Sequence, residues 1–152
     1  MRRFVFRAEA ALELRRRQEE EALRVLGAAE ARERVAARRL ADSEQQLSEA
    51  LSHAREAECV AGDTTLRMWH RNWIVGRQQQ VGRCRTEVEA RRSEVNDARR
   101  LAMDARRKRK TLERLRQKAF VSWQEAERRE EQKAIDDLAT VRFVQARTGG
   151  HP

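Results

Sequence analysis

Proline is nearly absent from this 152-residue chain, since the only one is Pro152 at its end. Proline removes a helix hydrogen bond and clashes with the preceding turn, so its absence leaves the rest of the chain free to be helical. Tyrosine is missing, and aromatic residues make up 5% of the sequence against 39% charged residues. This balance excludes a large globular core and is typical of a coiled coil or a long helix.

Other absences narrow the class of protein further. No run without charges approaches the ~18 residues that a membrane span needs. Arg7 interrupts the apolar residues Phe4, Val5 and Phe6, so no secretory signal can form there. Two cysteines, Cys59 and Cys84, are too few for a disulfide framework. Together these absences favour a cytoplasmic protein.

Small and aliphatic residues recur every seven positions along two charged tracts, which favours helix over the disorder that high charge would also allow. The rows of the first tract include Leu12, Leu26, Leu40 and Leu47, and Ala22, Ala29, Ala36, Ser43 and Ala50. Those of the second include Val81, Val88, Val95 and Ala102, and Cys84, Ala98, Ala105 and Leu112. Each tract therefore has the apolar seam of a coiled coil, interrupted at Arg15, Glu19, Glu33, Arg77 and Arg91.

The tracts meet near Gly62 and Asp63, where Gly62 can end one helix and Asp63, Thr64 or Thr65 can cap the next. We expect an all-α fold in which two long helices form an antiparallel coiled-coil hairpin. It is a single domain over residues 1–152. Helix one spans about 4–60, the turn about 61–64, helix two about 65–147 and a frayed tail 148–152. A later turn, near Arg71 and Asn72, would bring the two cysteines together, and we favour the earlier one.

The two arms of this hairpin are unequal. A reversal at Gly62 and Asp63 brings Phe4 and Phe6 to the level of Phe120 and Trp123, which predicts an aromatic cluster at the open end. Beyond Trp123, helix two has no partner. The residues left over include an apolar set at helical spacing: Ala134, Ile135, Leu138, Val141 and Phe143. A lone helix cannot bury such a stripe, so we expect it to dock onto a partner.

The sequence contains no recognisable catalytic motif. His53, His70 and His151 lie apart, and no zinc-protease, phosphate-loop or dinucleotide motif occurs. A metal site of Cys59, His70 and Cys84 would match no usual zinc spacing. We therefore expect no catalytic residue, metal site, cofactor or small-molecule substrate, and no enzymatic activity.

The net charge of +9 predicts attraction to acidic surfaces. The sharpest cluster is the basic run Arg106, Arg107, Lys108, Arg109 and Lys110. Such a run can bind phosphates without sequence preference, yet no aromatic residue interrupts it for base stacking. An acidic protein is therefore favoured over nucleic acid. Near the reversal, Trp69 and Trp73 lie one helical turn apart, and they either staple the turn or anchor a partner.

Several short motifs resemble a known family. The opening Phe4-x-Phe6, followed by Leu12-x-Leu14, Glu19-Glu20-Glu21-Ala22 and Leu26, resembles the start of the flagellar export protein family FliJ. Near the other end, Lys110-x-Leu112-Glu113-x-Leu115 and Lys133-x-x-Asp136-Asp137 with Phe143 are similar to the terminal helix of that family. The similarity covers both ends and the length of the chain.

The resemblance implies a coiled-coil stalk of the flagellar type III export apparatus, peripherally associated with the inner membrane at the flagellar base. Its partners would be the flagellar export ATPase, an export-gate membrane protein and export chaperones. The resemblance places the ATPase contact at the open end, on Phe4, Phe6, Ile135, Leu138, Val141 and Phe143. It places the gate contact on Trp73, Arg77, Gln80 and Cys84, of which only Trp73 keeps the aromatic character that the family shows.

Three alternatives remain open at this stage. The closest is the equivalent stalk of a virulence type III secretion system. The initial Phe4-x-Phe6 favours the flagellar stalk over this alternative. A second is a nucleic-acid-associated coiled coil that uses the basic run. A third is a structural rod, dimeric and roughly twice as long as the hairpin.

Overall fold

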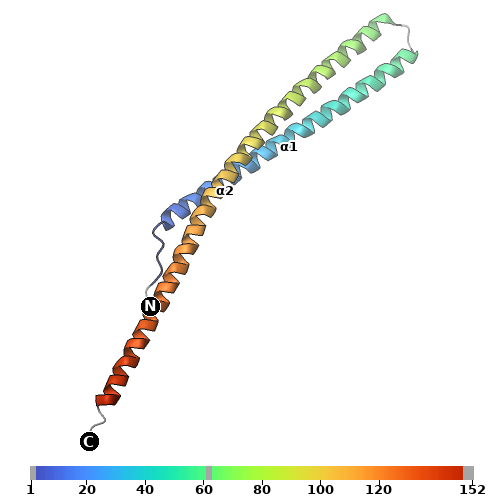
Figure 1. Cartoon of the computed structure of the whole chain (residues 1–152). Coiled ribbons are helices and arrows are strands. Elements are labelled where there is room, and N and C mark those ends of the chain that lie inside the picture. Colours follow the sequence, from blue (N-terminus) through green and yellow to red (C-terminus); the bar gives the residue numbers. More distant parts are fainter. Residues whose placement is uncertain (1–2, 61–62, 149–152) are drawn as a thin grey trace. The chain divides into compact units, whose positions relative to one another are not determined.

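The computed structural model describes residues 3–60 and 63–148, and these residues form two helices and no strand. Helix α1 spans Glu9–Val60 and helix α2 spans Thr64–Thr148 (Figure 1). The prediction of an all-α fold built from two long helices is confirmed. Part of the expected turn, residues 61–62, and most of the expected tail, residues 149–152, lie outside the described residues.

Helix α1 begins at Glu9 and not near Phe4, as the sequence had suggested. Residues 3–6 have no regular structure, and Arg7 and Ala8 form a turn. The amide of Glu9 donates to the carbonyl of Phe6 over 3.1 Å, which closes that turn. In this non-helical start, the Phe4 ring contacts the aromatic rings of Phe120 and Trp123 on α2.

Helix α2 begins with a cap that the sequence had offered among three candidates. The amide of Thr65 donates to the Asp63 carboxylate over 2.9 Å, and the amide of Arg67 donates to the Asp63 carbonyl over 3.3 Å. A side-chain oxygen in this position satisfies a helix amide that would otherwise lack a partner. Asp63 is therefore the N-cap.

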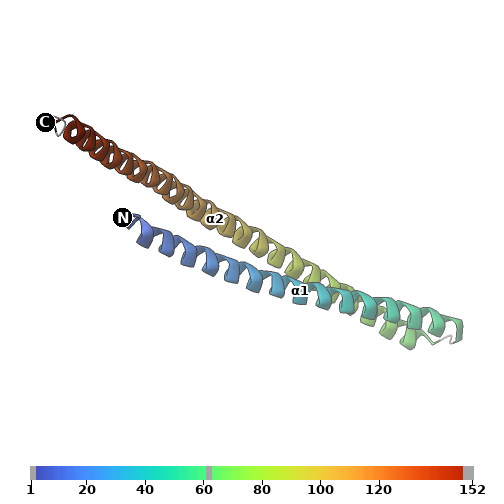
Figure 2. The same cartoon turned by 90° about the horizontal axis from the view of Figure 1, so that it is seen from below.

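Contacts divide the chain into two compact units, which we describe separately. The hairpin unit comprises residues 18–105, and the terminal unit comprises residues 1–17 with 106–152. Within the hairpin unit, the end of α1 and the start of α2 run antiparallel beside each other (Figures 1 and 2).

The buried residues of the hairpin unit follow the predicted heptad rows. In α1 they are Ala29, Ala36, Ser43 and Ala50. In α2 they are Val81, Cys84, Val88, Val95, Ala98 and Ala102. Leu26 packs against the cluster of Ala29, Val95 and Ala98. The seam is thus confirmed, and because most of its members are small, each buries little apolar area.

Ion pairs across the seam fix the register of the hairpin unit. Arg92 pairs with Glu33 over 3.4 Å, and Arg39 pairs with Glu87 over 3.6 Å. Nearer the turn, Arg85 pairs with Glu44 over 2.9 Å. These pairs align the two helices in antiparallel fashion, with α1 ending at Val60 and α2 beginning at Thr64. The arginines are exposed, and Glu33 and Glu87 are only partly buried. Each pair therefore stabilises the hairpin by at most about 1 kcal/mol and sets register more than stability.

One polar atom of the seam has no partner. The Ser43 hydroxyl oxygen is buried and makes no hydrogen bond within the described residues. Burying an unpaired hydroxyl costs about 1–3 kcal/mol, so Ser43 weakens the seam at its centre.

We expect Ser43→Ala to raise the free energy of unfolding by about 1.5 kcal/mol, from relief of the unpaired hydroxyl and from better helix propensity. The exposed Ser48→Ala is the matched control and should gain only about 0.5 kcal/mol, from propensity alone. Urea unfolding followed by circular dichroism measures both. Equal gains for the two variants would show that Ser43 carries no buried penalty.

Candidate partner-binding surfaces

The terminal unit starts with an aromatic cluster that joins the chain's first residues to α2. The Phe4 ring lies 5.2 Å from the Phe120 ring, edge to face, and 5.8 Å from the Trp123 ring. Phe120 and Trp123 stack at 5.9 Å. Phe6 and Trp123 also line a shallow groove there. The predicted cluster is confirmed, and its rings are half-buried, so part of each stays accessible.

Within the terminal unit, the start of α1 also packs against α2. Leu12 is completely buried. Arg116 pairs with Glu9 over 3.1 Å, and Glu113 pairs with Arg109 over 2.5 Å and with Arg16 over 3.8 Å. These contacts hold residues 9–17 against the middle of α2.

The last part of α2, residues 124–148, we call the terminal segment. It extends as a single helix, and every described residue from 128 onward is exposed (Figure 1). Its large apolar side chains are therefore open, among them Leu138 at 61% and Phe143 at 62% exposure. The structure thus leaves the apolar residues of the predicted overhang uncovered within the described part of the chain.

These apolar residues do not share one face of the helix. At about 100° per residue, Ala134, Leu138 and Val141 lie within about 60° of one another. Phe143 lies about 140° from Leu138 and about 160° from Val141. The Phe143 ring instead lies beneath the Arg147 guanidinium, 5.6 Å from its centre. The terminal segment therefore presents apolar surface on opposite sides, and not the single stripe that spacing alone had suggested.

The four residues of the expected gate contact differ in accessibility. Trp73 is half-buried, and Arg77 lies 5.9 Å over its ring while donating to the Gln46 side chain over 2.7 Å. Gln80 is exposed, whereas Cys84 is only 6% exposed and belongs to the seam. A partner could therefore touch Trp73, Arg77 and Gln80 directly, but not Cys84 without opening the hairpin.

Trp69 enlarges this surface. Its ring stacks on Trp73 at 5.4 Å, yet 58% of the residue is exposed. The rings pack on each other, and Trp69 remains accessible, so its role as an anchor for a partner stays a prediction. The gate strip as inferred from the family resemblance did not include Trp69, although its spacing of four residues from Trp73 was a sufficient signal.

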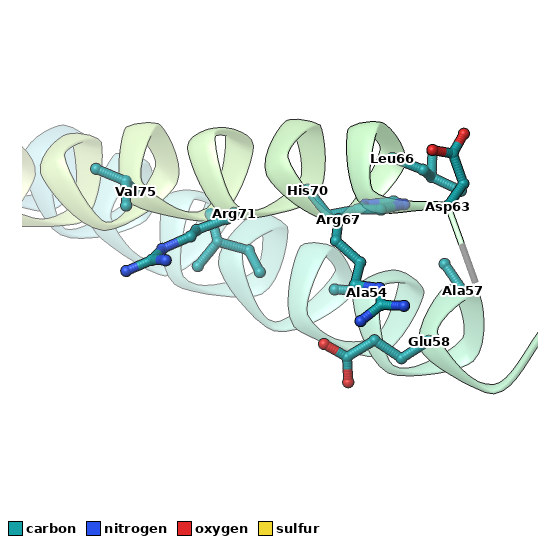
Figure 3. Close-up of a pocket in the computed structure, with 10 residues that line it drawn as sticks. Ala54, Ala57, Glu58, Asp63, Leu66, Arg67, His70, Arg71 and Val75 are labelled. Carbon is teal, nitrogen blue, oxygen red and sulfur yellow. The ribbon is translucent and has the colours of Figure 1, made fainter. Parts of the chain in front are cut away.

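A hollow of about 310 Å³ lies beside the turn of the hairpin unit. Figure 3 shows side chains from both helices around it, including Ala54 and Ala57 of α1 and Leu66 and His70 of α2. The Nδ1 atom of His70 is buried there without a hydrogen-bond partner in the described residues. The alanines of α1 are too small to fill the space, so the hollow is a gap in helix packing.

The basic run winds around α2 and does not form one patch. Arg109 is half-buried and paired with Glu113, while Arg106, Arg107, Lys108 and Lys110 are exposed. Among the described residues, no group of three or more histidine, cysteine, aspartate or glutamate side chains could hold a metal ion. In the same residues, no helix is long and apolar enough to cross a bilayer.

These features define the class of the protein: an all-α hairpin protein whose exposed apolar and charged helix faces are suited to binding other proteins. The chain matches the family model described as Flagellar FliJ protein over residues 7–148, nearly its whole length, and it belongs to that family. The family resemblance of the sequence is thereby confirmed, and the chain is a structural component of flagellar type III protein export. No curated protein and no solved structure matches the chain.

We expect Phe4→Ala to destabilise residues 9–17 locally, by about 1–2 kcal/mol, because the aromatic cluster loses one of its three mutually packed rings, the one contributed from outside α2. Hydrogen exchange should speed up in residues 9–17 and stay unchanged in residues 29–50. Val5→Ala is the control, since Val5 is 75% exposed and should have no effect. Unchanged exchange in the Phe4 variant would show that the cluster does not hold the start of α1.

Proposed function

We propose that this chain is the stalk of the flagellar export ATPase, with its terminal segment inserted into the ATPase ring. The observation that carries the proposal is the arrangement of Leu138 and Val141 on one side of a bare helix and Phe143 on the other. A groove on a partner covers one face of a helix. A ring encloses all faces, and so it can bury apolar residues on opposite sides at once.

The rest of the predicted ATPase contact fits the same arrangement. Phe4 and Phe6 lie at the aromatic cluster with Trp123, which directly precedes the terminal segment on α2. Ile135 adds a further exposed apolar side chain within the segment. The helix rises about 1.5 Å per residue, so residues 124–148 reach about 36 Å into a partner. This length is sufficient to cross much of a ring-shaped protein.

We further propose that Trp73, Arg77 and Gln80 contact the export-gate membrane protein. The support is the pair of stacked tryptophans beside an exposed polar strip, since half-exposed tryptophan and arginine are common anchors of protein interfaces. Cys84 acts indirectly in this proposal, by holding the seam below the strip. Binding of export chaperones and association with the inner membrane remain predictions from the family.

We expect Leu138→Asp and Phe143→Asp each to lower stimulation of the export ATPase by about tenfold, because each buries a carboxylate in an apolar contact. ATP hydrolysis measured against stalk concentration tests this. Leu101→Asp is a matched control, since Leu101 is 65% exposed but lies in the hairpin unit. Full stimulation by both terminal variants would refute insertion, and loss in only the Leu138 variant would favour a one-sided groove.

For the gate contact, we expect Gln80→Ala to weaken binding to the soluble part of the gate protein by about threefold to tenfold, with an unchanged melting temperature. Cys84→Ser should lower the melting temperature, because it places a second hydroxyl in the seam near Ser43. Calorimetry of binding and thermal unfolding measure the two effects. Undisturbed binding in the Gln80 variant and in Trp73→Ala would exclude this strip.

A further inference from the structure

The positive charge of the chain is concentrated in one region. Residues 18–105 contain 15 lysines and arginines and 16 aspartates and glutamates, and so they are nearly neutral. Residues 124–152 contain 5 basic and 6 acidic residues. Residues 1–17 and 106–123 contain 14 basic and only 3 acidic residues, which accounts for the whole excess of the chain. Such segregation creates a strong local field.

Much of this charge lies on one face of α2. The basic ladder, as we call it, consists of Arg106, Arg107, Lys110, Arg114 and Lys118. Four of its members follow one another at intervals of four residues, and all five lie within about 120° around the helix axis. The half-buried Leu112 lies on the opposite side, so the ladder faces away from α1.

The ladder is exposed and unneutralised. All five side chains are exposed, and no ion pair of theirs occurs among the described residues. Between residues 106 and 123 the only acidic residue is Glu113, which is already paired with Arg16 and Arg109. In the hairpin unit, by contrast, arginines beside the seam face glutamates of the other helix. Five like charges along about 18 Å repel one another, and an acidic partner would relieve that repulsion.

The charges of the terminal segment indicate which kind of partner could bind the basic ladder. This segment follows the ladder on the same helix and carries six carboxylates: Glu125, Glu127, Glu130, Glu131, Asp136 and Asp137. Five basic residues offset these carboxylates, so the segment is nearly neutral. A uniformly negative surface, such as duplex nucleic acid or an anionic bilayer, would attract the ladder but gain nothing from the charges of the terminal segment, and duplex nucleic acid would leave its exposed apolar residues uncovered. A protein can present acidic residues opposite the ladder and basic or apolar residues opposite the terminal segment.

We propose that the basic ladder docks onto an acidic protein surface at the entrance of the ring that takes up the terminal segment. This inference rests on the proposed stalk function, because it assigns both surfaces to the same ATPase. The ladder steers the stalk toward the ring and fixes how far it enters, while the apolar residues beyond it supply the buried contact. Lys118 lies about 30 Å from Leu138 along the helix, so the two contacts are separate in space.

The test compares two charge-reversed stalks of equal net charge. The ladder variant carries Arg107→Glu, Lys110→Glu and Arg114→Glu. The control carries Arg34→Glu, Arg38→Glu and Arg83→Glu, which are exposed residues of the hairpin unit. Binding to the export ATPase from the same genome is measured by fluorescence anisotropy at 50 and 300 mM salt. Circular dichroism confirms that both variants are helical.

We expect the ladder variant to bind at least about tenfold more weakly than the wild type at low salt, and to lose most of the salt dependence. The control should bind like the wild type. Equal affinity of the ladder variant and the wild type would overturn the ladder proposal and leave the stalk function standing. A wild-type chain that does not bind the ATPase would overturn both.

Two further probes separate the other sources of negative charge. Duplex DNA and vesicles containing phosphatidylglycerol are titrated with the same three stalks at 150 mM salt. We expect weak binding to both, with little difference between the ladder variant and the control. Tight binding to either probe that only the ladder variant loses, together with unchanged ATPase binding, would assign the ladder to nucleic acid or membrane and overturn the proposal.

Discussion

Close packing of small side chains along the seam is the constraint on which the structure depends. Alanines of α1 meet valines and alanines of α2 in heptad rows, so the helices of the hairpin unit can approach closely although each contact buries little area. Such a seam tolerates no large polar intrusion, yet it includes the unpaired Ser43 hydroxyl. The seam therefore gives the hairpin unit only modest stability.

The surface of α2 differs along its length, depending on whether the helix packs on α1. Where α2 packs on α1, its outer face is free to carry charge without cost to the core, as the basic ladder does. Where α2 has no partner, in the terminal segment, apolar residues stay exposed on opposite sides of the helix. One continuous helix thus combines a support, an electrostatic surface and an apolar contact.

Charge has two roles in this protein, and they differ in range. In the hairpin unit, Arg92 with Glu33 and Arg39 with Glu87 set the register through largely exposed pairs that contribute little stability. In the terminal unit, the unpaired cations of the basic ladder act over about 8 Å at physiological salt. The first role selects one alignment of two helices of the same chain. The second offers an acidic partner a complementary surface, because no carboxylate of the described residues neutralises the ladder.

The sequence by itself determined the helices, the seam and the register, because heptad spacing and the proline-free tracts act locally and repeat many times. It also predicted the cluster of Phe4 with Trp123, and it narrowed the cap of α2 to Asp63, Thr64 or Thr65, from which the structure selected Asp63. Only the tertiary structure showed that residues 3–6 leave the helix, since the gain from ring packing is not local. It alone showed that Cys84 is buried by the seam while Trp69 is open, and which cations of the basic run lack a partner. Burial and pairing depend on what faces a residue across space, and spacing along one chain does not contain that information.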